Sequence, residues 1–269
     1  MNKTEVINGG KYKFTVTTNI QLYEDRITCH TYKLGGEYAD CVNISYKYKN
    51  NKPVKAMIPH LLYEPECAVA SLLTKGSGTE LMIMTAILYA YNDVPSVPIF
   101  EFEDDSNIDC VEKQMTTPPP RKTVKPVNLA FFNIAYHGKT WYESRFNAQM
   151  IDSEKYKRYK KSLEFLTDPA KKPEFKNFLE IIENKHAADS PEVRMLENCY
   201  KAPTYRKFFE AIPREVRCSV LYEWLDTFMK HYIIYDNNWY INARNMEALQ
   251  SGGNREKFYI FSYKKTSNF

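Results

Sequence analysis

A closely spaced pair of glycines is the part of this sequence best suited to bind a ligand. The segment Lys75-Gly76-Ser77-Gly78-Thr79 comes just before an apolar pattern of helical period. Glycine accepts backbone angles that other residues resist, so the segment predicts a turn. The first N–H groups of a helix lack intrahelical partners and carry partial positive charge. We therefore expect this turn to bind phosphate or pyrophosphate through Gly76, Ser77, Gly78 and Thr79, with Lys75 adding charge and Leu73 leading into it.

A group of carboxylates follows in the chain and could act in proton transfer. Glu101, Glu103, Asp104 and Asp105 lie on or just after a predicted strand. Neighbouring carboxylates raise one another's pKa, which suits a general base. The plain alternative is a solvated strand end or a helix N-cap at Asp105 or Ser106. We take Glu103 and Asp104 as the candidate bases.

Histidine and cysteine add few further candidates. His137, beside Gly138, is a possible acid or base, but a lone loop histidine is more often incidental. The other histidines have no metal-ligand spacing, and Cys110 has no nearby histidine to activate it. The six cysteines form no CxxC pair, so we expect them to be small apolar fillers in a reduced intracellular compartment.

A strand, turn, helix and strand must position the glycine pair and the carboxylates. Cys67–Leu73 is a short apolar run that predicts a buried strand before the turn. From Thr79 the period becomes helical, and Asn92-Asp93 and Pro95 end the helix. Pro98–Glu103 then alternates as a strand does. The apolar positions of the helix are Leu81, Met84, Ile87, Leu88 and Tyr91.

The residues before this unit predict antiparallel β structure. Alternating segments end at turn signals such as Gly35-Gly36 and Asn50-Asn51. The predicted strands are Tyr12–Thr18, Arg26–Tyr32, Tyr38–Tyr48 and Lys55–Tyr63. Antiparallel strands followed by one β-turn-α-β unit favour an α+β fold with a central mixed, twisted sheet.

In the second half of the chain, a predicted connector and strand are followed by predicted helices. Asp109–Lys125 contains three consecutive prolines and predicts an extended connector, and Val127–Tyr136 predicts a strand. A helix starts at Trp141 after a cap at Thr140. The following helical pattern predicts an inserted helical block over residues 151–231. Its helices are Ser153–Leu166, Glu174–Asn184, Pro191–Lys201, Thr204–Ala211 and Arg214–His231.

The C-terminal residues return to a β pattern. Tyr232–Tyr235 and Trp239–Ala243 flank a turn at Asp236-Asn237-Asn238, and Lys257–Lys264 alternates strongly. We therefore expect a core over residues 1–150, the helical block over 151–231, and C-terminal strands over 232–269 that complete the sheet.

Composition excludes some classes of function. The net charge is +4, from 37 basic and 33 acidic residues, which is too balanced to indicate nucleic-acid binding by itself. A basic helix face over Lys155–Lys161 keeps such binding open as a third alternative, although a solvated face is the simpler interpretation. No apolar run is long enough for a membrane span.

The glycine turn resembles the cofactor-binding motif of the GNAT (Gcn5-related N-acetyltransferase) superfamily. That motif, Arg/Gln-x-x-Gly-x-Gly/Ala, lies between a strand and a helix, and here Lys75 replaces the Arg or Gln and Gly78 matches the first glycine. The segment Trp141-Tyr142-Glu143-Ser144-Arg145-Phe146 resembles the family's LYExxGF segment without its glycine. The resemblance implies acetyl-CoA bound at Leu73 and residues 75–79, and Tyr142 as the acid that protonates the departing thiolate.

Glu80 departs from the family pattern. The family has a second small residue where this chain has a carboxylate. A carboxylate close to a bound pyrophosphate would repel it by about 1 kcal/mol or more. Either the Glu80 side chain points away from the cofactor, or the turn does not bind CoA as the family does.

The Asn-, Lys- and Tyr-rich sequence resembles proteins of nucleocytoplasmic large DNA viruses. This resemblance implies an intracellular viral protein, in the host cytoplasm or the virus factory, and leaves open whether it is packaged in the virion. The leading hypothesis is acyl-CoA-dependent N-acyl transfer to an amine or protein acceptor. The competing hypothesis is a non-catalytic structural or interaction protein that retains the fold and binds other viral proteins.

Overall fold

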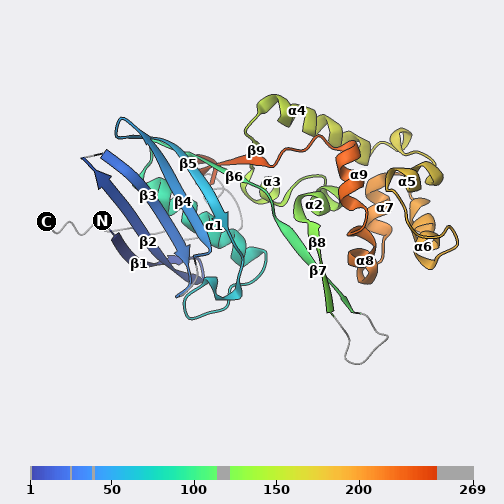
Figure 1. Ribbon diagram of the computed structural model, residues 1–269, viewed down its shortest axis with the longest axis horizontal. Helices are drawn as coiled ribbons and strands as arrows, with labels where there is room; N and C mark the ends of the chain where they lie inside the picture. The colour runs from blue at the N-terminus through green and yellow to red at the C-terminus, as the bar shows by residue number, and fades with distance from the viewer. Residues whose placement is uncertain (1, 25, 38–39, 114–121, 247–269) are drawn as a thin grey trace. The chain divides into compact units, whose positions relative to one another are not determined.

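The computed structural model describes residues 2–24, 26–37, 40–113 and 122–246 (Figure 1). The chain divides into two compact units. Among the described residues, unit 1 comprises those up to Glu103, residues 145–148 and residues 240–246, and unit 2 comprises residues 104–113, 122–144 and 149–239. Both α-helices and β-strands are present, so the expected α+β class is confirmed.

The described residues contain one large mixed sheet whose pairs are mostly antiparallel. Its strand order is β1-β2-β3-β4-β5-β6-β10-β9, and the boundary between the units falls within β10. Adjacent strands from β1 to β5 pair antiparallel, as the alternating segments predicted. The strands are β1 (Asn2–Gly9), β2 (Tyr12–Tyr23), β3 (Arg26–Gly35), β4 (Val42–Lys49), β5 (Lys52–Leu61), β6 (Ile99–Glu103), β9 (Gln149–Met150) and β10 (Asn238–Asn242).

Alternation of side chains buries one face of this sheet in unit 1. Successive residues of a strand point to opposite faces, so every second side chain enters the core. The tight β4–β5 turn places Asn50 and Asn51 at φ of 52° and 57°, a conformation that asparagine tolerates. The buried positions include Phe14, Val16, Tyr32, Leu34, Ile44, Tyr46, Ala56 and Ile58.

Helix α1 (Ser77–Asp93) connects β5 to β6 and contacts β1, β3 and β4 (Figure 1). Strands β5 and β6 are parallel, with Ala56 opposite Phe100. The predicted helix, its end at Asp93 and the strand after it are all confirmed. The apolar residues of α1 explain its place in the core, since Met82, Ile83, Ile87 and Ala90 are each 0% exposed.

The predicted strand Cys67–Leu73 is wrong. A short 3₁₀ helix, Pro65–Cys67, and turns occupy this part of the chain, and the strand before α1 is β5. Pro65 lacks a backbone N–H and suits the first position of a helical turn. Cys67 forms a disulfide with Cys41, so the prediction that all cysteines are apolar fillers is also wrong.

Unit 2 begins with a two-stranded sheet and a helix. Strands β7 (Asn107–Lys113) and β8 (Lys122–Asn128) pair antiparallel, and residues 114–121, with the three prolines, lie outside the described residues. The predicted strand Val127–Tyr136 is wrong, because α2 (Leu129–His137) covers most of it. The side chain of Asn128 accepts a hydrogen bond from Phe131 N at 3.0 Å and caps this helix.

The rest of unit 2 is mainly helical, and aromatic side chains form its core. Phe178, Tyr205, Phe208 and Phe228 are each 0% exposed, and their rings contact one another. The predicted long helix Arg214–His231 is instead broken into three pieces at Arg217 and Trp224. The α-helices are α3 (Trp141–Phe146), α4 (Ser153–Ser162), α5 (Phe175–Ile181), α6 (Pro191–Tyr200), α7 (Tyr205–Ala211), α8 (Arg217–Leu221) and α9 (Leu225–Tyr232).

The C-terminal β prediction is correct at one of its three places. Strand β10 matches the expected strand Trp239–Ala243. The expected strand Tyr232–Tyr235 is wrong, because Tyr232 ends α9 and the next residues have no regular structure. Lys257–Lys264 lies outside the described residues.

Candidate functional site

The glycine turn lies at the N-terminus of α1. Gly76 is the N-cap residue with φ 79° and ψ −89°, a left-handed conformation that favours glycine. Ser77 begins the helix, and no side-chain hydrogen bond caps it. A Cβ atom added to Gly76 would meet no atom within 4 Å. The Cβ position of Gly76 therefore faces open space, and Ser77 beside it is exposed. The first N–H groups of a helix can bind an anionic oxygen.

Close packing favours glycine at position 78. A Cβ atom at this position would lie 3.0 Å from Thr74 Oγ1 and 3.1 Å from two side-chain carbons of Leu73. Leu73 is only 2% exposed, so it cannot easily move. Leu73 thus supports the first turn of α1 by packing.

Side chains distant in sequence fix the approach to the turn. Tyr12 OH lies 2.8 Å from Thr74 Oγ1 and accepts a hydrogen bond from Thr74 N at 3.2 Å. Thr74 Oγ1 also lies 3.3 Å from Ser77 Oγ. Burial favours the neutral phenol, yet the hydrogen bonds with Thr74 and the nearby Lys11 lower the pKa of Tyr12 below its ordinary value. The contact of Tyr12 with this turn could not be predicted, because Tyr12 lies 62 residues from Thr74 in the chain.

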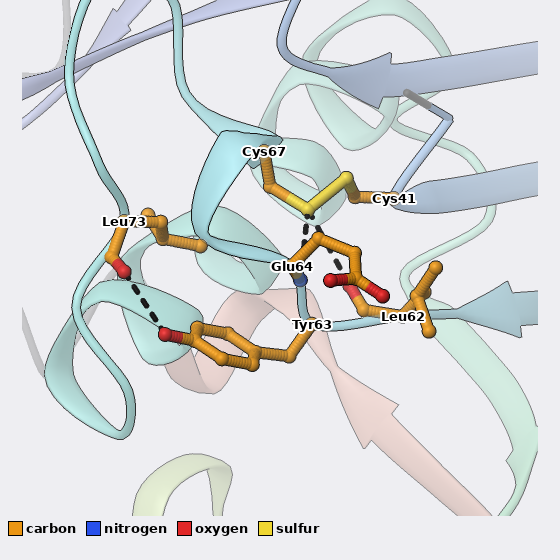
Figure 2. The surroundings of a disulfide bond; sticks show 6 residues. All are labelled: Cys41, Leu62, Tyr63, Glu64, Cys67 and Leu73. Carbon is orange, nitrogen blue, oxygen red and sulfur yellow. Dashed lines mark hydrogen bonds between the residues drawn. A yellow bond between two sulfur atoms is a disulfide. The ribbon is translucent and has the colours of Figure 1, made fainter. Parts of the chain in front are cut away.

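Lys75 lies at the surface beside this turn. Its Nζ is 5.8 Å from the ring centroid of Tyr63, a cation–π contact. The hydroxyl of Tyr63 donates a hydrogen bond to Leu73 O at 3.0 Å (Figure 2). The positive charge that the sequence predicted is therefore held next to the turn by an ordered ring.

The Glu80 side chain forms an ion pair with Arg145. Its Oε2 lies 3.2 Å from Arg145 Nη1, and the Glu80 side chain is 17% exposed. A guanidinium at this distance offsets the repulsion that Glu80 alone would exert on a bound phosphate. Arg145 belongs to the Trp141–Phe146 segment quoted above, but its partner could not be predicted from the sequence.

Glu103 ends β6 and is exposed. Strands β5 and β6 are parallel, so their carboxyl ends lie at one edge of the sheet. The helix that connects them must begin at that same edge, and the glycine turn lies there too. Glu101, two residues earlier, forms an ion pair with Lys55. Of the two glutamates on β6, only Glu103 is at the strand end.

Asp104 is buried in unit 2 and hydrogen-bonded. Its Oδ1 accepts from Ser106 N at 3.3 Å and from Ser106 Oγ, and its Oδ2 accepts from Tyr235 OH at 2.9 Å. The residue is 4% exposed. Burial raises the pKa of Asp104, while the hydrogen bonds of Ser106 and Tyr235 act against the shift. This carboxyl group is therefore part of the core of unit 2.

Tyr142 is also buried in unit 2, at 6% exposure. Burial, and after it the negative charge of Asp104, raises the pKa of the Tyr142 hydroxyl. Such a hydroxyl keeps its proton and can donate it only to a group that reaches the interior. The structure therefore brings Tyr142 and Asp104 into electrostatic contact within unit 2, whereas residues 73–79 and Glu103 belong to unit 1.

Glu143 organises the segment around Tyr142. It accepts a hydrogen bond from Thr140 N at 2.8 Å, while Thr140 Oγ1 accepts one from Glu143 N at 3.1 Å. This reciprocal pair is a capping box, so the predicted cap at Thr140 is confirmed. Tyr159 OH donates to Glu143 at 2.7 Å, and Lys160 Nζ lies 3.2 Å from it. Glu143 therefore joins α3 to α4.

His137 and Cys110 were the remaining candidates. His137 is the exposed last residue of α2, and the side chain of Cys110 lies outside the described part of the structure. In the described ranges no group of His, Cys, Asp or Glu side chains could hold a metal ion. None of the helices described there is long and apolar enough to cross a bilayer.

Comparison with protein-family models, with curated proteins and with solved structures gave no match.

Proposed function

We propose that this chain binds acetyl-CoA, or a closely related acyl-CoA, at the glycine turn and transfers the acyl group to an amine. One observation carries the proposal: an uncapped glycine turn opens a long helix between two parallel strands, at the edge where those strands end. Ligands of open α/β arrangements bind at such an edge. Pyrophosphate suits the N–H groups of Ser77, Gly78 and Thr79.

The charges around the turn support an anionic cofactor. Lys75 supplies a nearby cation, and Arg145 neutralises Glu80. Two features thus compensate for the carboxylate that departs from the GNAT pattern. The resemblance to that superfamily then favours CoA over other pyrophosphates.

Transfer to an amine requires one proton acceptor and one proton donor. The amine nitrogen forms a bond to the thioester carbonyl carbon, the carbon–sulfur bond breaks, and the thiolate takes up a proton. Glu103 is the better candidate base, because it is exposed at the strand end, whereas Asp104 is buried and hydrogen-bonded. The family resemblance alone implies Tyr142 as the acid, and its burial within unit 2 does not support that role.

Burial of Tyr142 and Asp104 favours a second candidate function. A protein that binds the cofactor, or only keeps the fold, needs no accessible acid, and both side chains are at most 6% exposed. The alternative is a non-catalytic viral structural or interaction protein. Such a protein would act inside an infected cell or a virion, and it would co-purify with other viral proteins.

Substitution of Ser77 tests cofactor binding with little risk to the fold. Ser77 is exposed at the first position of α1, where an acidic residue stabilises a helix. Ser77→Asp should therefore fold at least as well as the wild type while repelling pyrophosphate, and Ser77→Asn is the matched neutral control. Acetyl-CoA should raise the melting temperature of the wild type and Ser77→Asn but not of Ser77→Asp. Binding without turnover on any amine would favour the second candidate.

A further inference from the structure

A buried disulfide ties the loop that carries the glycine turn to the sheet (Figure 2). Cys41 lies just before β4, and Cys67 ends the short 3₁₀ helix of the loop over residues 62–76, here called the connecting loop. The two Cα atoms are 5.9 Å apart. Both cysteines are 0% exposed. Neither sulfur can therefore meet a dissolved thiol while the native loop is closed.

Hydrogen bonds around the disulfide depend on the position that it fixes. Leu62 N donates to Cys41 O at 2.7 Å, and Glu64 N donates to Cys67 Sγ at 3.3 Å. Leu73 N donates to Pro65 O at 2.6 Å, which closes the loop just before the glycine turn. The disulfide and these hydrogen bonds together connect β4 to Leu73, just before the glycine turn.

The loop backbone lies close to Gly36, the residue that follows β3. A Cβ atom at Gly36 would lie 1.8 Å from the backbone oxygen of Glu66. Val69 N also donates to Lys13 O on β2 at 2.8 Å. The backbone on both sides of Cys67 therefore touches the sheet directly.

We propose that the glycine turn is assembled by an oxidative maturation step, in which Cys41 and Cys67 are joined before the connecting loop closes. The two thiols lose two protons and two electrons as the sulfur–sulfur bond forms. A disulfide of an oxidised dithiol protein or of oxidised glutathione accepts them and becomes two thiols. Burial makes the product permanent, so the bond acts once and is not a reversible switch.

The disulfide is expected to affect both the order of the connecting loop and the binding of a ligand at the glycine turn. Only the effect on ligand binding rests on the function proposed above. Without the bond, the connecting loop opens more often and the N–H groups of the turn are held less firmly. One of these disulfide acceptors must therefore be present where the protein matures, because disulfides are rare in compartments that keep thiols reduced.

The test has two parts, both on the full-length chain. The first treats native oxidised protein with a thiol reductant and an alkylating reagent, followed by mass spectrometry of the labelled peptides. We expect Cys41 and Cys67 to remain unlabelled until denaturant is added, while the half-buried Cys29 and Cys199 react first. Rapid native labelling of Cys41 and Cys67, or their presence as thiols after oxidative refolding, would overturn the proposal.

The second part measures hydrogen exchange in Cys41→Ala/Cys67→Ala, with Cys29→Ala as the matched control. The amides of Leu62, Val69 and Leu73 should exchange at least about tenfold faster in the double variant and at the wild-type rate in the control. Unchanged exchange in the double variant contradicts the proposal. If the double variant exchanges faster but the wild type does not bind acetyl-CoA, only the proposed function is rejected.

Discussion

Breaking the Cys41–Cys67 disulfide removes a constraint from the unfolded chain of unit 1. The bond spans a sequence separation of 26 residues. The chain-entropy relation for a closed loop of that size gives a stabilisation of about 3.5 kcal/mol at room temperature. We therefore expect reduction of the wild type to lower the free energy of unfolding of unit 1 by about that amount. The double alanine variant should lose more, because it also empties two buried sulfur positions.

The two units can be followed separately during this measurement. The three tryptophans, Trp141, Trp224 and Trp239, all belong to unit 2. Tryptophan emission therefore reports on unit 2, and hydrogen exchange of the β2–β3 amides across a urea series reports on unit 1. The comparison of reduced with oxidised wild type isolates the cross-link, since the side chains are the same.

The reasoning fails if reduction changes the stability of unit 1 by less than about 1 kcal/mol. The hydrogen bonds and packing of the connecting loop would then hold it without the cross-link. If Cys29→Ala lost as much stability in unit 1 as the double variant, the effect would come from removing a cysteine in general and not from the disulfide.

Three further predictions concern charge. Ser77→Asp should weaken acetyl-CoA binding at least about tenfold relative to Ser77→Asn, measured by titration calorimetry, and equal affinities would contradict an anion site at the turn. Arg145→Ala should weaken the same binding about threefold to tenfold, because Glu80 loses its guanidinium partner; unchanged affinity would place Glu80 away from the ligand. Burial lowers the pKa of His30 although Asp93 acts to raise it, so the unfolded chain binds the proton more readily. The contribution of neutral His30 to the free energy of unfolding should be fully present above the unfolded-state pKa of about 6.5 and should be lost as the pH falls below it. In His30→Phe the urea midpoint should change less with pH over this range.

Elements with a clear period could be predicted from the sequence. The alternating strands of the first half and β6 follow from patterns that local residues determine. Helix α1 was predicted too, but its predicted apolar face was partly wrong, because Met84 and Tyr91 are only half-buried while Met82 and Ile83 are buried. Continuous apolar runs could not be assigned in the same way. Val127–Tyr136 has no period that separates a buried strand from a buried helix, and the cap at Asn128 decides for the helix.

Features that depend on distant partners could not be predicted. The pairing of Cys41 with Cys67 is one of many that six cysteines allow. The contact of Tyr12 with Thr74 and the ion pair of Glu80 with Arg145 each join segments more than sixty residues apart. The sequence therefore located the glycine turn but not the side chains that surround it.

Binding of acetyl-CoA to the oxidised full-length chain tests the central claim most directly. Titration calorimetry with acetyl-CoA, at ligand concentrations up to millimolar, should show one site per chain in the wild type and in Ser77→Asn. Ser77→Asp should show a loss of affinity while its melting temperature stays at or above that of the wild type. No heat of binding and no thermal shift in the oxidised wild type at millimolar acetyl-CoA would contradict the account.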